Sequence, residues 1–340
     1  MNKVLAVLAL LCGTALPIAA QTKILVARSR VRVSVAGEYP GGLAYPTASD
    51  EQGRLYVKLI AAGPGMVGPL FRLSSKGLVE AEFDTSGAII NRYAVRPGGG
   101  VIMIHSDGVN KFIDNFAPDG SRESSVRLER PPTPFFPSQL AVFHSGEILV
   151  AGLQYHPGYK ASTAIYDPTG RLVKQLVLDR DGEIERGLES GGTEDTFATQ
   201  QNTRAIDQSV AIAGDDGLVY LMRATSPVIV YAISAAGDVI RQIVVRPPTG
   251  IGSPNFGIRV VKNRLAIQFR RSCDKVDSDS CRGSTYAIVD ATTGKRLAVY
   301  EAEEEAAGTM ACYAPDPDRL FTFSVSLDHH GLDIVEAGPK

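Results

Sequence analysis

The chain has 340 residues, with 35 basic and 37 acidic side chains and a formal net charge of −2. This near balance excludes a strongly basic nucleic-acid-binding face and a polybasic membrane patch. Hydrophobic residues make up 44% of the chain, which is enough for a packed core, but no stretch after the first twenty residues is long and apolar enough to cross a membrane.

The first twenty residues have the pattern of a secretory signal peptide. Lys3 supplies a positive start, an apolar run covers residues 4–11, and small residues precede the polar Gln21. We therefore expect cleavage after Ala20 and export to the periplasm or the extracellular space. We expect the remainder, residues 21–340, to be a single domain and a monomer.

The clearest structural signal lies between Ser209 and Val245. Four apolar runs of strand length follow one another there, and glycine with Asp or Ser marks two hairpin turns, at 214–217 and 234–238. Branched and aromatic residues in these runs favour a pleated backbone. The stretch predicts one four-stranded antiparallel sheet.

Weaker copies of this unit recur along the chain, each with a tight turn before a strand. The steps between copies are mostly about 46 to 55 residues, with one longer step, and four-stranded propeller blades repeat at about 40–50 residues. An all-β, six-bladed propeller is therefore expected; a two-sheet sandwich is the alternative, but it does not explain six similar units. The last turn residues of the six copies are Gly53, Gly100, Gly146, Gly217, Asn263 and Asp318.

The two ends of the chain complete one unit between them. Only one strand remains after residue 325, and a spare strand is present at residues 23–35. Pairing the two in one blade closes the ring and removes exposed sheet edges. In the first unit the second turn has two candidates, Ser75–Gly77 and Asp84–Gly87.

This architecture places short, similar turns on one face of the ring and long, varied loops on the other. The longest varied segment is an insertion at about 179–207. Because loops on a rigid scaffold carry most binding sites, we expect the site on the face with the varied loops.

Several polar and aromatic residues fall in those varied loops. Histidine is a common general base and metal ligand, whereas polar residues in a loop are also simply solvated. Phe135 and Phe136 lie in a proline-rich crossing and either present an apolar contact or tuck between blades. The candidate ligand-binding residues are His105, Asp107, Phe135, Phe136, Tyr155, His156, Arg223, Arg270, Arg271, Asp328 and His329.

A second group of candidates lies near the starts of the innermost strands. Asn91, Asp207 and Asn255 offer oxygen ligands of the kind that suits Ca²⁺ or another divalent cation, although they also fit a role as polar caps of strand ends. In this respect the chain resembles the gluconolactonase-like six-bladed propellers. That resemblance implies a channel metal that assists lactone hydrolysis; no other cofactor is expected.

Three cysteines follow the expected signal peptide. Cys273 and Cys281 lie in one polar loop and predict a disulfide in an oxidising compartment. Cys312 is left over in a strand-like run, where it is expected to behave as a small buried hydrophobe.

Signatures of familiar catalytic chemistry are absent from the sequence. It has no G-x-S-x-G, H-E-x-x-H, Cys-x-x-Cys or Walker motif. The repeat pattern resembles the exported propellers of the NHL-repeat and TolB-like kind, which implies a scaffold that binds a protein, peptide or glycan. The sequence therefore predicts a non-enzymatic binding module, with a metal-assisted hydrolase of the lactonase type as the alternative.

Overall fold

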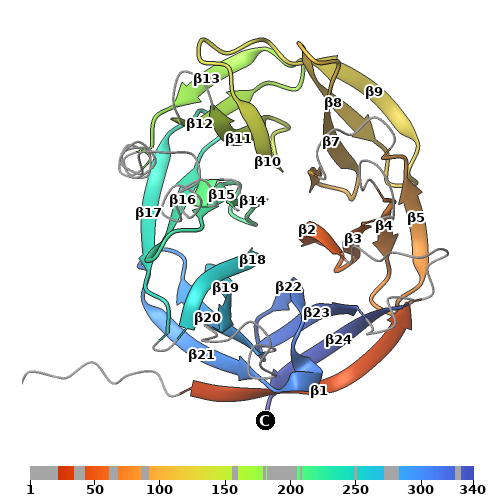
Figure 1. Cartoon of the computed structure of the whole chain (residues 1–340), viewed down its shortest axis with the longest axis vertical. Coiled ribbons are helices and arrows are strands. Elements are labelled where there is room, and N and C mark those ends of the chain that lie inside the picture. The colour runs from red at the N-terminus through yellow and green to blue at the C-terminus, as the bar shows by residue number, and fades with distance from the viewer. Residues whose placement is uncertain are drawn as a thin grey trace, which may run out of the picture.

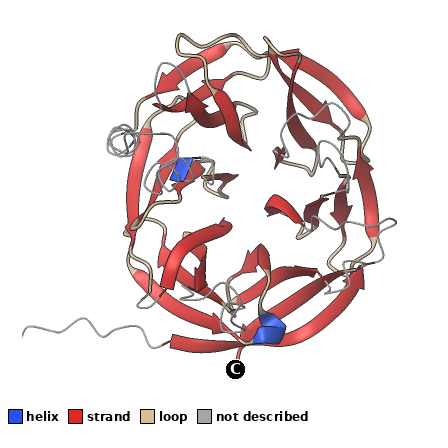
Figure 2. Cartoon of the chain, viewed as in Figure 1, coloured by secondary structure: helices blue, strands red, loops and turns tan. Residues whose placement is uncertain are grey.

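The described part of the chain is almost entirely β-strand (Figure 2). It contains 24 strands, the short 3-10 helix η2 (Glu304–Ala306), and helical residues at 181 and 205–206. The computed structural model describes residues 22–33, 43–60, 68–85, 92–154, 160–178, 181, 205–206, 209–248, 251–271, 283–325 and 331–340.

Four sheets of four antiparallel strands make up most of a ring, each running in chain order from the centre outward (Figure 1). The first has β2 (Leu43–Ser49), β3 (Leu55–Leu59), β4 (Leu70–Leu73) and β5 (Val79–Phe83). The second has β6 (Tyr93–Val95), β7 (Val101–Ser106), β8 (Lys111–Phe116) and β9 (Arg122–Arg127). The third has β10 (Phe136–Val142), β11 (Ile148–Gln154), β12 (Lys160–Tyr166) and β13 (Leu172–Leu176). The fourth has β14 (Val210–Ala213), β15 (Val219–Arg223), β16 (Val228–Ile233) and β17 (Val239–Val245).

The rest of the ring is one eight-stranded sheet, in the order β18-β19-β20-β21-β1-β24-β23-β22. All its neighbours are antiparallel except β1 and β21, which pair in parallel. Its strands are β18 (Ile251–Val261), β19 (Arg264–Arg271), β20 (Ser284–Asp290), β21 (Arg296–Ala302), β22 (Thr309–Ala314), β23 (Arg319–Val325), β24 (Leu332–Pro339) and β1 (Thr22–Val33).

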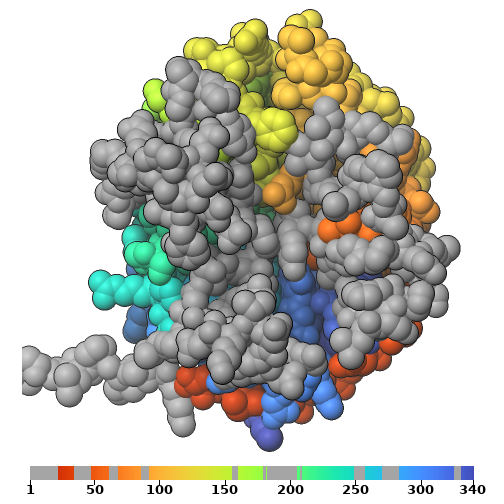
Figure 3. Space-filling view, in the orientation of Figure 1, coloured from red at the N-terminus to blue at the C-terminus, as the bar shows by residue number. Residues whose placement is uncertain are grey.

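Strands from both ends of the chain close this sheet, as the sequence predicts. β1 pairs with β24 in antiparallel register from Leu25–Pro339 to Val33–Leu332. In the space-filling view, the red residues of β1 and the blue residues of the C-terminal part lie together along the lower edge (Figure 3). The prediction of an all-β, propeller-like ring of four-stranded antiparallel sheets is confirmed.

The hairpin turns lie where the sequence places them. The stretch from Ser209 to Val245 forms the fourth sheet, with its two turns at 214–218 and 234–238. In the first sheet, the turn between β4 and β5 is the earlier of the two candidates. It closes through Gly77, whose φ of 77° lies in the left-handed region that glycine adopts without strain.

Because the strands are antiparallel and follow one another outward, each sheet places its first and third connections at one end. We call this end the turn face. The second connection and the crossing to the next sheet lie at the opposite end, which we call the loop face. The short turns and the long segments therefore separate onto two faces of the ring.

Successive residues of each strand pack against different neighbouring sheets, since side chains alternate across a sheet. Leu55, Val57 and Leu59 of β3 face β22–β24. The alternate residues of the first sheet face the second sheet. We call this packed layer the first interface; its buried members are Tyr56, Leu70, Ala81, Phe83, Tyr93, Val101, Met103 and Phe116.

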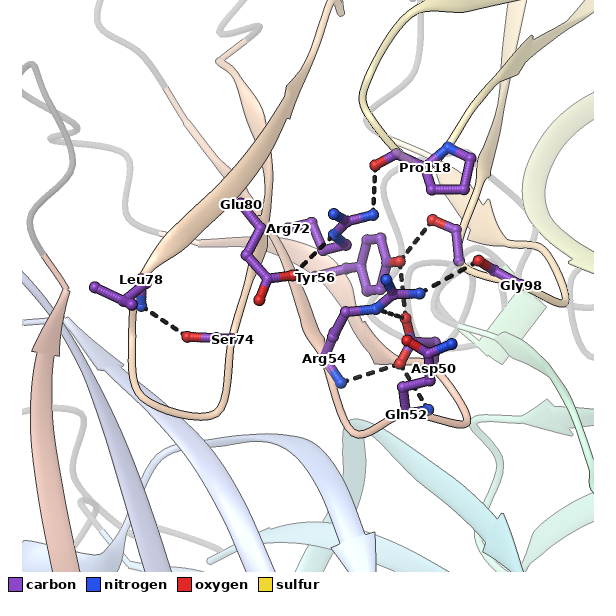
Figure 4. A network of polar contacts seen from close by, with 11 residues as sticks. Asp50, Gln52, Arg54, Tyr56, Arg72, Ser74, Leu78, Glu80, Gly98 and Pro118 are labelled. Atoms are coloured by element: carbon purple, nitrogen blue, oxygen red, sulfur yellow. Dashed lines mark hydrogen bonds and ion pairs between the residues drawn. The ribbon is translucent and has the colours of Figure 1, made fainter.

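At the turn face, polar contacts fasten the first interface (Figure 4). Arg54 Nε lies 2.6 Å from Asp50 Oδ2, and the Tyr56 hydroxyl lies 3.0 Å from the same oxygen and 2.7 Å from the Gly99 carbonyl oxygen. Arg72 pairs with Glu80 at 3.2 Å and donates to the Pro118 carbonyl of the second sheet. These contacts join the first and second sheets at this end, although Arg72 Nε itself makes no hydrogen bond to a described residue.

Candidate functional site

The second sheet carries a histidine–aspartate pair at its loop-face end. His105 lies near the end of β7, and its Nδ1 is 2.8 Å from Oδ2 of Asp114 on β8. The imidazole also stacks on Phe112, with ring centroids 4.8 Å apart and an interplanar angle of 8°. The ring is thus fixed on two sides, while its side chain remains 23% exposed.

Asp114 is itself held in place, because it is buried and also pairs with Arg122. The Asp114 carboxylate lies within ion-pair distance of Nδ1, although His105 Nδ1 makes no hydrogen bond within the described part of the chain. The pair thus places a negative charge beside a ring that can take up and release a proton. The sequence analysis missed Asp114. An aspartate inside an apolar strand was the available signal, but only the pairing of β7 with β8 brings it to His105.

Asp107 does not join this pair. Its carboxylate accepts from the backbone of Val109 and Asn110, at 3.2 and 2.8 Å, and from Asn110 Nδ2 at 2.9 Å. The hydrogen bonds from Asn110 lower the pKa of Asp107, since they favour the charged form. Asp107 therefore shapes the connection between β7 and β8.

The two adjacent phenylalanines have different surroundings. Phe135 packs against the core between the second and third sheets, whereas Phe136, the first residue of β10, is 43% exposed. Lys111 Nζ lies 5.4 Å from the centroid of the Phe136 ring and 2.9 Å from Ser106 Oγ. Val109, in the same connection, is 79% exposed. We call Val109, Lys111 and Phe136 the Phe136 patch.

Arg223 does not lie exposed at the loop face as the sequence suggested; it is completely buried. Its Nε and NH2 donate to the two oxygens of Asp181, at 3.1 and 2.9 Å. Further donations reach Ser209 Oγ and Thr163 Oγ1, at 3.2 and 3.3 Å. All these partners are protein groups, so Arg223 anchors the start of the insertion to the third and fourth sheets.

A second buried arginine lies near the centre of the ring. Arg259 of β18 donates to the carbonyl oxygens of Ala311 and Met310 on β22, at 2.6 and 3.1 Å, and of Thr47 on β2, at 2.6 Å. Burial lowers the pKa of its guanidinium to about 10. The sequence analysis missed this residue, although an arginine in the apolar run IRVV was a visible signal.

Lys58 of β3 was missed as well. It is 1% exposed, and no described residue forms a hydrogen bond or ion pair with its amine. Burial lowers the pKa of Lys58 to about 8, because an apolar surrounding disfavours the charged form. Its signal in the sequence was a lysine inside the strand pattern RLYVKL.

The turn face holds a cleft of about 400 Å³ between the second and third sheets. His144 lines it, and its Nε2 lies 2.9 Å from Glu51 Oε1. None of the predicted site residues lines this cleft.

The remaining predicted residues stay predictions. Arg270 and Arg271 end β19, and Asn255 lies within β18, but their side chains fall outside the described residues. Among the described residues, no three His, Cys, Asp or Glu side chains group as metal ligands, and Cys312 is a free, partly buried thiol. Wholly outside the described residues lie Asn91, Tyr155, His156, Asp207, Cys273, Cys281, Asp328 and His329.

No protein-family model and no curated protein matches the chain. Solved structures do match it. One carries a provisional gluconolactonase assignment; the match has 12% identity and a TM-score of 0.50, and covers 92% of this chain and 93% of that one. The fold is that of a β-propeller.

Two further structures have related architecture and lower similarity. BamB from Moraxella catarrhalis is 13% identical with a TM-score of 0.39, and covers 92% of this chain and 99% of its own. The Dos1 propeller is 10% identical with a TM-score of 0.43, over 86% and 77%. Within the described residues of this propeller, no helix has the length and apolar character needed to cross a membrane.

Proposed function

We propose that the protein is an exported, six-bladed propeller that binds a protein or peptide partner on its loop face. The blade count follows if the eight-stranded sheet is divided at its one parallel pairing, between β1 and β21. Each half then has four antiparallel strands, like the other four sheets. Export through the signal peptide, the Cys273–Cys281 disulfide and a monomeric state belong to this proposal.

The observation that carries the binding role is the Phe136 patch. An exposed aromatic ring at the start of an innermost strand, with a lysine amine above it, combines apolar area with positive charge. Aromatic residues with one exposed face are frequent anchors of protein interfaces. A peptide segment with an apolar side chain and a neighbouring carboxylate fits this chemistry.

The test compares capture by three forms of the protein. We expect Phe136→Ser combined with Val109→Ser to reduce binding to a peptide array at least tenfold. Ile240→Ser is the matched control, because Ile240 is an exposed aliphatic residue on the outer strand β17. Equal binding by all three forms would contradict the proposal, and selective capture on a glycan array would replace the peptide by a glycan.

A second candidate function is supported by the His105–Asp114 pair. An imidazole held beside a carboxylate and stacked on Phe112 is suited to removing a proton from water, so a hydrolase of the lactonase type remains our alternative. A divalent cation held by Asn91, Asp207 and Asn255 would polarise the lactone carbonyl. His105→Asn should then abolish lactone hydrolysis, and Asp207→Ala should remove bound metal in elemental analysis. Retained metal in Asp207→Ala would contradict this ligand set.

A further inference from the structure

Lys58 differs from the other buried charges that the structure describes. Seven charged residues are buried, and six of them have protein partners: Arg72, Asp114, Asp181, Arg223, Arg259 and Asp333. Lys58 has no such partner among the described residues. Burying an ammonium group without a partner costs several kcal/mol, so its amine is not explained by stability.

The other repeat units show which residues occupy the strand position equivalent to Lys58. Lys58 is the fifth residue after Gly53, whose amide closes the turn to the Asp50 carbonyl. The same count can be made in every other unit, and in the second sheet it starts from Gly99, whose amide closes the equivalent turn to the Arg96 carbonyl. The residues there are buried, and apart from Lys58 only Gln268 among them is polar. Gln268 donates to Ser284 Oγ and the Gly308 carbonyl, at 2.9 and 2.6 Å, and accepts from the Met310 amide. The equivalent residues are Ile104, Ala151, Met222, Gln268 and Phe323.

Lys58 faces the first interface. It lies on the same side of β3 as Tyr56 and directly opposite Leu70 of β4, and both of these belong to that layer. It lies two residues nearer the loop face than Tyr56. On this side of the first sheet, its described neighbours are therefore an aromatic ring and an aliphatic side chain.

His105 and Asp114 face the same layer from the second sheet. Asp114 is directly opposite Met103, a member of the first interface, and His105 is two residues beyond Met103 toward the loop face. The first sheet thus contributes the amine of Lys58 to the first interface, and the second sheet contributes the imidazole of His105. Both groups lie near the loop-face end of this interface.

We propose that Lys58 forms an imine with a carbonyl compound, an aldehyde or a ketone, and that His105 acts as its acid and base. The uncharged amine attacks the carbonyl carbon, so an N–C bond forms and the carbonyl oxygen becomes a hydroxyl. His105 transfers a proton to that hydroxyl, which leaves as water, and the nitrogen loses its protons to give C=N. Addition of water reverses the reaction, and no oxidant or reductant is needed.

The environment of Lys58 favours a nucleophilic amine. Burial is the cause of the lowered pKa of Lys58, and no carboxylate of the described residues offsets it, so this lysine retains an uncharged fraction near neutral pH. Since burial lowers its pKa from 10.5 to about 8, the uncharged fraction near neutral pH is about 300-fold larger than for an exposed lysine. This reactivity is separate from partner binding at the Phe136 patch and does not depend on it.

The test is reductive labelling of the folded, full-length mature protein with acetaldehyde and cyanoborohydride, mapped by mass spectrometry. We expect Lys58 to be labelled at least tenfold faster than the exposed Lys174, with a rate that rises with pH and levels off above about 8. Preferential labelling of Lys174 and other exposed lysines over Lys58 would overturn the proposal.

Two variants, Lys58→Met and His105→Asn, distinguish a reactive lysine from a structural one, and Lys174→Met is their control. Lys58→Met should abolish labelling at this position while the melting temperature stays the same or rises, and Lys174→Met should leave labelling of Lys58 unchanged. His105→Asn should slow labelling of Lys58 at least tenfold without moving the midpoint of its pH profile. A lower melting temperature for Lys58→Met would show a structural lysine, and an unchanged rate for His105→Asn would remove His105 from the site.

Discussion

The polar side chains at the two ends of the first interface differ in how many hydrogen bonds and ion pairs they form. At the turn face, Asp50, Arg54 and Tyr56 satisfy one another and the Gly99 carbonyl, and Arg72 crosses to the second sheet. At the loop face, the amine of Lys58 is buried without a described partner, and the His105 side chain is 23% exposed. The polar side chains at the turn end therefore connect the two sheets. At the loop end, Lys58 and His105 remain able to react with a ligand.

The largest effect should come from a loop-face group that is structural. Asp181→Ala leaves the fully buried Arg223 guanidinium unpaired, and we expect the free energy of unfolding to fall by about 3–5 kcal/mol. Urea denaturation measures this. If Asp181→Ala changed stability by only a few tenths of a kcal/mol, the anchoring role of Arg223 would be wrong. Asp238→Ala is the control, because its pair with Lys174 is exposed.

The turn end should show the next largest effect. Asp50→Ala removes the acceptor shared by Arg54 and Tyr56, and we expect a loss of about 1–3 kcal/mol in unfolding free energy. The pKa of Tyr56, which burial and then Asp50 raise, should fall in this variant. A spectroscopic titration of the tyrosines follows that change. Unchanged stability would contradict the view that this network fastens the interface.

At the loop end, the contribution of Lys58 to the free energy of unfolding should increase with pH. A lysine in a structural ion pair would show the opposite dependence, because its stabilising effect is lost as pH rises. The folded-state pKa of Lys58 lies near 8, below its ordinary value of 10.5, so the unfolded chain binds more protons between these values. Stability from this residue therefore increases as pH rises from about 8 to 10.5, by about 1–3 kcal/mol. Denaturation of the wild type and Lys58→Met across this range measures it. A stability difference between the two that stays constant with pH would contradict the assignment.

The smallest effect should come from the outer turns of the turn face. The Asp167 carboxylate accepts from Thr169 and Arg171, and its pKa is lowered to about 2 by these bonds. Its stabilising contribution is present above pH 3.8 and is lost as pH falls through about 2. Asp167→Ala should therefore narrow the gap between melting temperatures at pH 6 and pH 2. Thr225→Ala, which lies outside this turn, should leave that gap unchanged.

The same difference between the two ends explains how much the sequence could predict. The turns are local signals, since Asp or Ser with glycine determines each hairpin over about five residues, so strand order and the closing role of β1 followed from counting units. The environments of single side chains depend on distant partners. Arg223 meets Asp181 from 42 residues away, and Arg259 meets Thr47 from 212 residues away.

The candidate site shows the same limit. The sequence predicted that His105, Asp107 and Phe136 lie in loops. It did not predict which of them would form hydrogen bonds within the protein and which would remain available to a ligand. Asp107 binds its own turn, and Asp114 reaches His105 through strand pairing. In the sequence, Lys58 resembles any other strand residue. Whether its amine is exposed or buried depends on which sheet packs against β3, and the sequence around Lys58 does not give that information.

The pairing of β1 with β24 has a consequence for how the protein is made. Arg32 on β1 pairs with Asp333 on β24, 301 residues later in the chain. β1 therefore emerges during synthesis long before β24, and β21 and β24 keep an open edge until β1 pairs with both. A chain that stops before residue 332 would leave β1 without its antiparallel partner, so we expect the ring to stay open in such a variant.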